Sequence, residues 1–249
     1  MSRSPLKFFV LVFALSIPIW LIEPRDWPIS ASVGAPLMAA LILVYRVEGG
    51  GGVRRLLRRI VDQWRIRDRL WYGPIIFLMP VIFLLTYGVV RLMGLPLSNE
   101  PYFPFLLTPL LFALFLIFGI GEEVGWTGYA TDPLQDRWSA LITSIVLGLV
   151  TALWHVVPLI QMGRTLIWIA WWALGSISIR ILTVWLYNNT GRSLFAVIVF
   201  HAMFNVSFAL FPNYGSHWDP AVAGVITAIV AVIVTFLWGP RTLARYRYG

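Results

Sequence analysis

The sequence predicts an all-α protein: a polytopic bundle of about eight transmembrane helices that forms a single domain over residues 1–249. Hydrophobic residues make up 59% of the chain and charged residues only 12%, and the mean hydropathy is +0.80. A soluble domain would carry about 25% charged residues. The apolar residues also gather in long runs, and a membrane-spanning helix needs about 20 of them in succession.

Eight apolar runs have the length, or nearly the length, of a membrane span. They cover residues 6–22, 29–45, 71–92, 103–130, 139–160, 165–187, 193–211 and 221–238. The second run is short, so we expect it to tilt less than the others or to be extended by its flanks. The first run follows a basic start, as in a signal peptide, but no small-x-small cleavage pattern precedes Glu23. We therefore expect a retained first span.

Basic residues predict how the chain is oriented. They gather in the N-terminal start, in the segment between the second and third runs, and in the tail. With an even number of spans these three regions lie on one side of the membrane, and an excess of lysine and arginine marks the cytoplasmic side. The sequence thus predicts a cell-membrane protein with both termini cytoplasmic. The loops of the opposite side contain Arg25, Arg164 and few other basic residues.

The net charge of +8 and the absence of cysteine narrow the possible functions. In a membrane protein such a charge is typical of orientation signals and of contact with anionic lipid headgroups. We therefore expect membrane lipids as partners and no nucleic acid. A chain without cysteine has no disulfide, no cysteine-rich metal cluster and no cysteine nucleophile.

The segment after the glycine run at 49–52 is predicted to be a basic amphipathic helix that lies on the inner leaflet. Its apolar residues recur at helical spacing, and arginines fill the opposite face. A solvated loop helix that only sets the topology is the alternative. The apolar positions are Val53, Leu56, Leu57, Ile60, Val61 and Trp64.

The predicted spans contain few side chains that can do proton or metal chemistry. A charged group at the bilayer centre costs at least ~2.5–3.5 kcal/mol, so such groups usually face a cavity or one another. Arg180, in the sixth run, could neutralise an acid or extend towards the membrane surface. His201 and Asn205 are four residues apart and share a helix face. The candidate site residues are Glu122, Glu123, His155, His201 and Asn205.

These residue types fit more than one kind of site. A carboxylate and an imidazole can activate a water, and a further polar group can hold the oxyanion that develops. The same donors could bind a divalent metal such as zinc through Glu122, His155 and His201. Taken alone, a membrane histidine or asparagine is often only an interhelical hydrogen-bonding group. A proton-coupled carrier would use the same set, and at this point that alternative stays open.

Three known signatures of intramembrane proteases are absent. The sequence has no His-Glu-x-x-His, no Gly-x-Ser-Gly and no Gly-x-Gly-Asp. Asp132, Asp136 and Asp219 all fall in predicted loops, so a pair of catalytic aspartates inside the membrane is not expected.

The motifs in residues 118–207 resemble those of the CPBP family of intramembrane proteases, the CAAX prenyl endopeptidase type II and bacteriocin-processing group also called Abi. Glu122 and Glu123 match the acids of its Glu-Glu-x-x-x-Arg motif. His155 in TALWH matches Phe-x-x-x-His, and His201 with Asn205 matches His-x-x-x-Asn. The resemblance implies an intramembrane endopeptidase with a catalytic-motif core over residues 103–211.

The resemblance also implies a role for each residue. Glu122 with His155 would activate the hydrolytic water near the cytoplasmic side of the membrane. His201 and Asn205 would stabilise the oxyanion, and Glu123 would support these groups. The family is described as metalloproteases, but a mechanism without metal also fits these residue types. Prenylated C-termini, peptide pheromones and bacteriocin leaders all remain candidate substrates.

Two positions depart from the family pattern. The family arginine falls on Thr127, and the phenylalanine of the second motif falls on Thr151. The arginine would orient or charge the glutamates, so an active enzyme needs a substitute cation, for which Arg180, Arg137 or a bound metal could serve. A non-catalytic binding or bacteriocin-immunity protein on the same scaffold is the alternative that this departure suggests.

Overall fold

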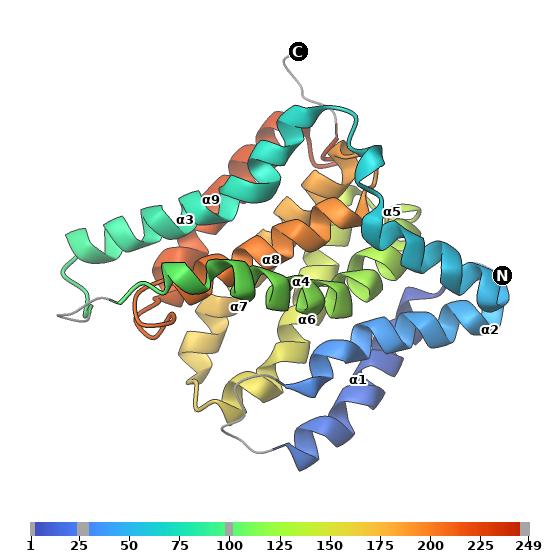
Figure 1. The fold of residues 1–249 in the computed structure, drawn as a ribbon, viewed down its shortest axis with the longest axis horizontal. Coiled ribbons are helices and arrows are strands. Elements are labelled where there is room, and N and C mark those ends of the chain that lie inside the picture. The colour runs from blue at the N-terminus through green and yellow to red at the C-terminus, as the bar shows by residue number, and fades with distance from the viewer. Residues whose placement is uncertain (1–2, 24–29, 98–101, 245–249) are drawn as a thin grey trace.

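The computed structural model describes residues 3–23, 30–97 and 102–244, and within these ranges it contains helices and their connections but no strands (Figure 1). The long helices of this part of the chain are α1 (Pro5–Ile22), α2 (Ala35–Arg58), α3 (Tyr72–Leu92), α4 (Thr108–Gly125), α6 (Ala140–Gln161), α7 (Leu166–Asn189), α8 (Leu194–Leu210) and α9 (Pro220–Trp238). A π-helical segment, η6 (Trp126–Thr131), and the short α5 (Asp132–Gln135) follow α4.

The predicted polytopic helical bundle is confirmed. In the described ranges seven helical segments are long and apolar enough to cross a membrane, and the shorter α8 is apolar over 17 residues. Each of the eight predicted runs corresponds to one long helix. Ile29, the predicted start of the second run, lies outside the described residues, as do Arg25 and the last five residues of the basic tail.

The second helix is longer than the sequence predicted. The apolar run up to Tyr45 and the basic segment after it form one helix, α2, which bends at Gly49, where φ is +64°. Glycine adopts a positive φ without steric cost. The glycine run therefore makes a bend inside α2 instead of a connection between two separate helices.

The predicted apolar face of the basic segment is only partly covered by protein. Leu56 is buried, with 1% of its surface exposed, whereas Val61 and Trp64 are 54% and 67% exposed. α2 ends at Arg58, and 3₁₀ turns lead on to α3. Contact of the exposed residues with lipid stays a prediction.

The helices that carry the candidate residues meet in the middle of the bundle. α4 and α8 pack along one another, α2 covers α4, and α3 packs on α8 (Figure 1). α7 packs between α6 and α9 and also contacts α8. The fold thus brings α4, α7 and α8, which are far apart in the sequence, to a common centre.

The predicted basic regions gather at one end of the bundle, which we call the basic end. Arg3 donates to Glu48 near the bend of α2 (Nε–Oε1 3.1 Å), Arg59 donates to Tyr187 at the end of α7 (2.6 Å), and the Ala140 amide donates to the Arg241 carbonyl after α9 (2.9 Å).

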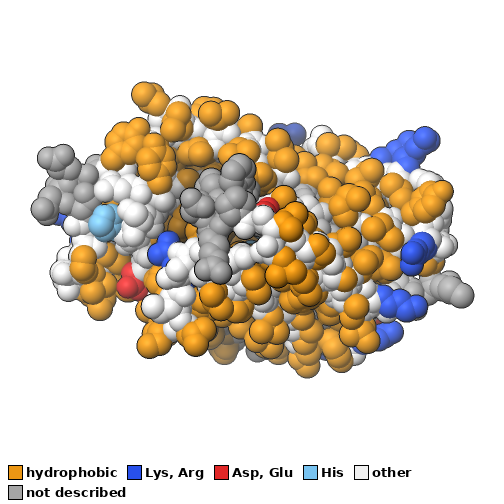
Figure 2. Space-filling view, turned by 90° about the horizontal axis from the view of Figure 1, so that it is seen from below, with side chains coloured by type: hydrophobic (Ala, Val, Ile, Leu, Met, Phe, Trp, Pro, Cys, Tyr) orange, Lys and Arg blue, Asp and Glu red, His pale blue; other side chains and the backbone are white. Residues whose placement is uncertain are grey.

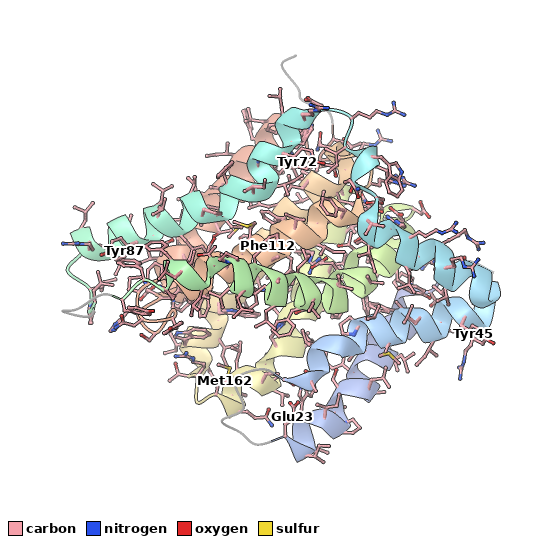
Figure 3. The ribbon with its side chains drawn as sticks, in the orientation of Figure 1. Glu23, Tyr45, Tyr72, Tyr87, Phe112 and Met162 are labelled. Atoms are coloured by element: carbon pink, nitrogen blue, oxygen red, sulfur yellow. The ribbon has the colours of Figure 1, made fainter. Side chains whose placement is uncertain are left out.

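The figures show the same two ends. In Figure 3, Tyr45 and Tyr72 lie towards the chain ends marked in Figure 1, whereas Glu23, Tyr87 and Met162 lie away from them. Figure 2 shows a face that is mostly hydrophobic, with several lysine and arginine side chains gathered at its right-hand end. The described parts of the N- and C-terminal segments therefore lie on the same side as the segment between α2 and α3, as the even number of spans predicts.

Close approach of α2 and α4 depends on glycine, and we expect Gly125→Ala to destabilise the protein by about 1–3 kcal/mol. A Cβ at Gly125 would lie 2.5 Å from the Pro36 carbonyl oxygen, and backbone cannot move aside as a side chain can. Gly88→Ala in α3 is the matched control, because a Cβ there meets nothing within 4 Å. Thermal unfolding in detergent measures both variants, and equal melting temperatures would contradict this packing.

Candidate active site

Small residues on α4 position the two glutamates. A Cβ at Gly119 would lie 3.1 Å from the Ile198 carbonyl oxygen of α8, and one at Gly121 would lie 2.8 Å from the Val33 carbonyl oxygen. These glycines allow α4 to lie close to α8 on one side and to the start of α2 on the other. Glu122 and Glu123 follow directly, in a stretch from Gly121 to Thr131 that is buried throughout.

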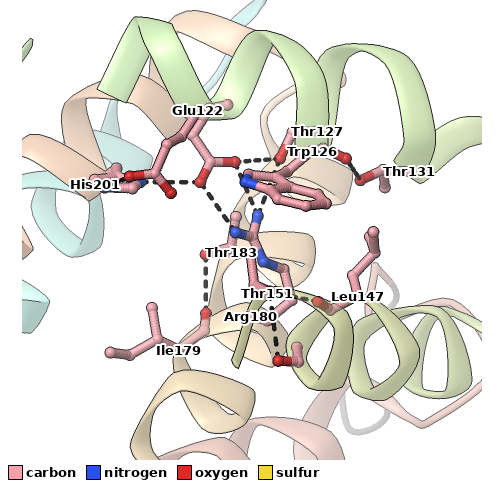
Figure 4. Close-up of polar contacts among 12 residues, drawn as sticks. Glu122, Trp126, Thr127, Thr131, Leu147, Thr151, Ile179, Arg180, Thr183 and His201 are labelled. Atoms are coloured by element: carbon pink, nitrogen blue, oxygen red, sulfur yellow. Dashed lines mark hydrogen bonds and ion pairs between the residues drawn. The ribbon is translucent and has the colours of Figure 1, made fainter. Parts of the chain in front are cut away.

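Glu123 is the centre of a buried ion-pair network. Arg180 of α7 donates from Nη1 to Oε2 (2.8 Å) and from Nη2 to Oε1 (3.2 Å), so that the guanidinium forks over the carboxylate (Figure 4). The Thr127 hydroxyl donates to Oε2 (2.6 Å), and His201 Nδ1 lies 2.9 Å from Oε1. Glu123 and Arg180 are only 1% and 7% exposed. With both oxygens engaged, Glu123 is not placed to take a proton from water.

The contact with Glu123 fixes the hydrogen bonding of His201. An ionised carboxylate only accepts, so Nδ1 of His201 carries the proton of this bond. The ring's second nitrogen, Nε2, then points towards Glu122, at 3.9 Å from its Oε1. His201 is therefore close to both glutamates, with Nε2 on the side of Glu122. Figure 4 shows His201 next to Glu122.

Glu122 differs from its neighbour in having no hydrogen bond to any described residue. His201 Nε2 lies 3.9 Å from its Oε1, which is an ion-pair distance but too long for a hydrogen bond. The residue is buried, with 7% of its surface exposed. Because a buried carboxylate without partners is costly, Glu122 is the acid that is free to bind a water or a substrate group.

His155 approaches the same region from α6. Its Nδ1 lies 2.8 Å from the Thr151 carbonyl oxygen, which only accepts, so this nitrogen carries a proton. In the neutral ring the lone pair is then on Nε2. The ring contacts Trp154 and Trp172, at centroid distances of 4.6 and 4.9 Å. It makes no direct hydrogen bond to Glu122.

The structure brings the candidate residues together to different degrees. Glu122, Glu123 and His201 are in contact or nearly so, whereas the hydrogen bond of His155 is to the Thr151 carbonyl. Asn205 is half-buried on α8, one turn after His201, and makes no hydrogen bond within the part of the chain that the structure describes.

Thr127 contributes a contact that the sequence analysis missed. The sequence analysis named position 127 only because the family pattern has an arginine there. In the structure the Thr127 hydroxyl donates a hydrogen bond to Glu123. Its position four residues after Glu123 on one helix was the available signal, since residues at this spacing are neighbours on the helix surface.

The sequence also predicted a divalent metal bound by Glu122, His155 and His201. The described residues contain no group of three or more histidine and acidic side chains spaced to hold a metal ion. Zinc in proteins usually takes at least three such ligands. Glu123, the acid nearest to His201, is already occupied by Arg180 and Thr127. A divalent metal at Glu122, His155 and His201 therefore stays a prediction, and the reaction proposed below uses side chains alone.

Two comparisons with known proteins cover this site. Residues 104–207 match the family described as type II CAAX prenyl endopeptidase Rce1-like. The CAAX prenyl protease 2 of Methanococcus maripaludis is 28% identical over 188 residues, an alignment that covers 70% of this chain and 68% of the relative. The matched family segment contains all five candidate residues together with Arg180.

Proposed function

We propose that this chain, which is similar to type II CAAX prenyl endopeptidases, belongs to the CPBP family of intramembrane proteases and cleaves a peptide bond with a water that Glu122 activates. The multi-pass helical fold and the family support an intramembrane endopeptidase. One observation supports Glu122 as the residue that activates the water. Glu122 is a buried carboxylate without hydrogen-bond partners, and it faces the imidazole that Glu123 holds in place.

The proposed reaction begins with a water between Glu122 and His155. Glu122 takes one proton as the water oxygen bonds to the scissile carbonyl carbon. The unprotonated Nε2 of His155 accepts a hydrogen bond from the other proton and so orients the water. A carboxylate and a neutral imidazole on two helices thus provide the base and the orientation.

Two groups on α8 are placed to stabilise the tetrahedral intermediate. When both ring nitrogens carry a proton, His201 donates from Nε2 to the oxyanion while Nδ1 donates to Glu123. The Asn205 amide donates from one turn further along the helix. Glu122 then returns its proton to the leaving nitrogen as the C–N bond breaks and the carbonyl re-forms. Glu123 takes no proton in this sequence and serves to hold His201.

The proposed substrate is a peptide with a prenyl group near its C-terminus. The Methanococcus relative is called a CAAX prenyl protease. Apolar side chains are also exposed along α4 and in the turn before it, where Leu106, Leu110 and Ile117 are 97%, 68% and 64% exposed. A membrane-anchored lipid tail could therefore approach along α4 without entering water.

Cleavage of a defined peptide tests this proposal. The protein is reconstituted in liposomes with a farnesylated peptide and, separately, with the same peptide without the lipid, and released C-terminal fragments are identified by mass spectrometry. We expect cleavage of the farnesylated peptide with a kcat/KM at least roughly tenfold higher, because one buried lipid contact of a few methylenes already contributes this much. Equal rates would contradict the lipid requirement. No cleavage, with a stable bound partner in pull-down, would favour the binding-protein alternative.

A chelator separates the metal-free reaction from the metal-dependent one. We expect turnover to be unchanged in the presence of a zinc chelator, since Glu122 and His155 supply the base and the orientation of the water. Loss of activity that added zinc restores would instead support the predicted metal ligands Glu122, His155 and His201.

The proposed orientation places the basic end in the cytoplasm and the site open towards it. Because the chain has no cysteine, single cysteines can be introduced without a background. In intact cells we expect a membrane-impermeant thiol reagent to label Ser216→Cys, in the turn between α8 and α9, and not Arg58→Cys. The reverse labelling pattern would contradict the orientation. Labelling of both positions after the cells are opened is the control.

A further inference from the structure

Arg180 is a buried cation that the proposed reaction does not use directly. It lies well inside α7, a helix of 24 residues, and only 7% of its surface is exposed. A buried arginine is costly unless it is paired and hydrogen-bonded. Both of its terminal nitrogens donate hydrogen bonds to Glu123, and Nη1 also lies 3.4 Å from the Thr127 hydroxyl.

We infer that Arg180 is the positioning residue of this site, which fixes Glu123 and, through Glu123, the orientation of His201 and the hydrogen bond that its Nδ1–H donates. The expected effect of Arg180 on turnover rests on the proposed function. Its expected effect on the hydrogen bond between His201 and Glu123 does not.

The contacts show how the effect reaches His201. A guanidinium that forks over a carboxylate defines the plane of that carboxylate, which a single point charge does not do. The Thr127 hydroxyl holds Oε2 from the side of α4. Oε1 of Glu123 accepts one hydrogen bond from Arg180, and His201 Nδ1 lies 2.9 Å from the same oxygen. Without Arg180 the carboxylate can turn, and the proton on Nδ1 loses its fixed acceptor.

The same geometry indicates that the cation could come from another helix. Thr127 Oγ1 lies 2.6 Å from Glu123 Oε2 and 3.4 Å from Arg180 Nη1, so position 127 borders both partners. It is also the position at which the family pattern has arginine. An arginine placed there starts one helical turn from Glu123. We therefore expect a guanidinium at 127 to replace the one from α7 when position 180 is small.

Histidine-selective ¹⁵N NMR tests the positioning without any substrate. The chain has three histidines, so the spectrum of labelled protein in nanodiscs is simple, and a His201→Gln sample assigns the signal of interest. We expect His201 Nδ1–H to give a downfield proton signal typical of a hydrogen bond to carboxylate. Arg180→Thr should lose this signal, and the swap variant Thr127→Arg/Arg180→Thr should regain it. Arg91→Lys, in α3 near the opposite end, is the control and should keep it.

A conservative variant covers the case in which Arg180→Thr does not fold. Arg180→Lys keeps the positive charge but not the fork, so we expect the protein to fold with the Nδ1–H signal weakened or broadened. An unchanged His201 signal in Arg180→Lys and in any folded Arg180→Thr sample would overturn the inference.

Activity assays distinguish failure of this inference from failure of the proposed function. If the farnesylated peptide is cleaved, Arg180→Lys should lower kcat roughly 10–100-fold, as loss of a residue that orients a histidine does, with KM unchanged within about twofold. The swap variant should recover most of the activity that Arg180→Thr loses. Wild-type cleavage with unchanged kcat in Arg180→Lys would overturn the positioning role alone. The expected NMR pattern without any cleavage by the wild type would overturn the proposed function alone.

Discussion

Replacing Glu122 by glutamine is expected to lower kcat about 10²–10⁴-fold, the usual contribution of a general base, while the protein stays folded. The amide has the size of the carboxylate but cannot take a proton from water. Glu122 makes no hydrogen bond to a described residue, so its charge is not needed to hold the helices together. KM should change little, because the loss falls on the chemical step.

Asp136→Asn is the matched control for this substitution. Asp136 is an exposed acid near the basic end whose side chain makes no hydrogen bond or ion pair in the described structure. It should keep wild-type kcat and melting temperature. A Glu122→Gln enzyme that turns over at the wild-type rate would remove Glu122 from the mechanism and return the two glutamates to a structural role.

Arg180→Leu is expected to cost about 3–5 kcal/mol of stability, since removal of one partner leaves a buried charge without compensation. Glu123 is 1% exposed, and in this variant its carboxylate would lose both hydrogen bonds from the guanidinium. The effect should be visible as a large fall in the melting temperature or in the yield of folded protein from the membrane.

A double variant separates the ion pair from simple packing. Arg180→Leu/Glu123→Leu removes both charges, and apolar replacement of a whole buried pair is often nearly neutral. We expect it to recover most of the stability that Arg180→Leu loses, while its activity stays low because His201 has lost its acceptor. If both variants were equally unstable, Arg180 would stabilise the fold through the packing of its side chain and not through its charge.

The helical bundle could be predicted because the membrane imposes it. A chain segment in lipid must satisfy its backbone hydrogen bonds within itself, so the length and polarity of the eight runs suffice to locate the spans. The course of α2 past Tyr45 was not predictable in this way. Four consecutive glycines are as typical of a loop as of a bend, and it is the packing of Leu56 in the core that continues the helix beyond them.

The sequence could name the candidate site residues but not which of them contact one another. Adjacent residues on a helix point about 100° apart, so Glu122 and Glu123 must face different neighbours, and the rotation of α4 that decides this is not a local property. The resemblance gave Glu123 a supporting role and named Arg180 as a possible substitute cation. The pairing of Arg180 with Glu123 alone depends on how α7 lies against α4, 57 residues away in the sequence.

The most direct test of the account is a structure of the Glu122→Gln protein in complex with the intact farnesylated peptide. We expect the scissile carbonyl to lie between the side chain at position 122 and α8, with its oxygen within hydrogen-bond distance of His201 Nε2 or the Asn205 amide. A water next to the side chain at 122 and His155 should face the carbonyl carbon. A scissile carbonyl beyond the reach of all four side chains would contradict the account.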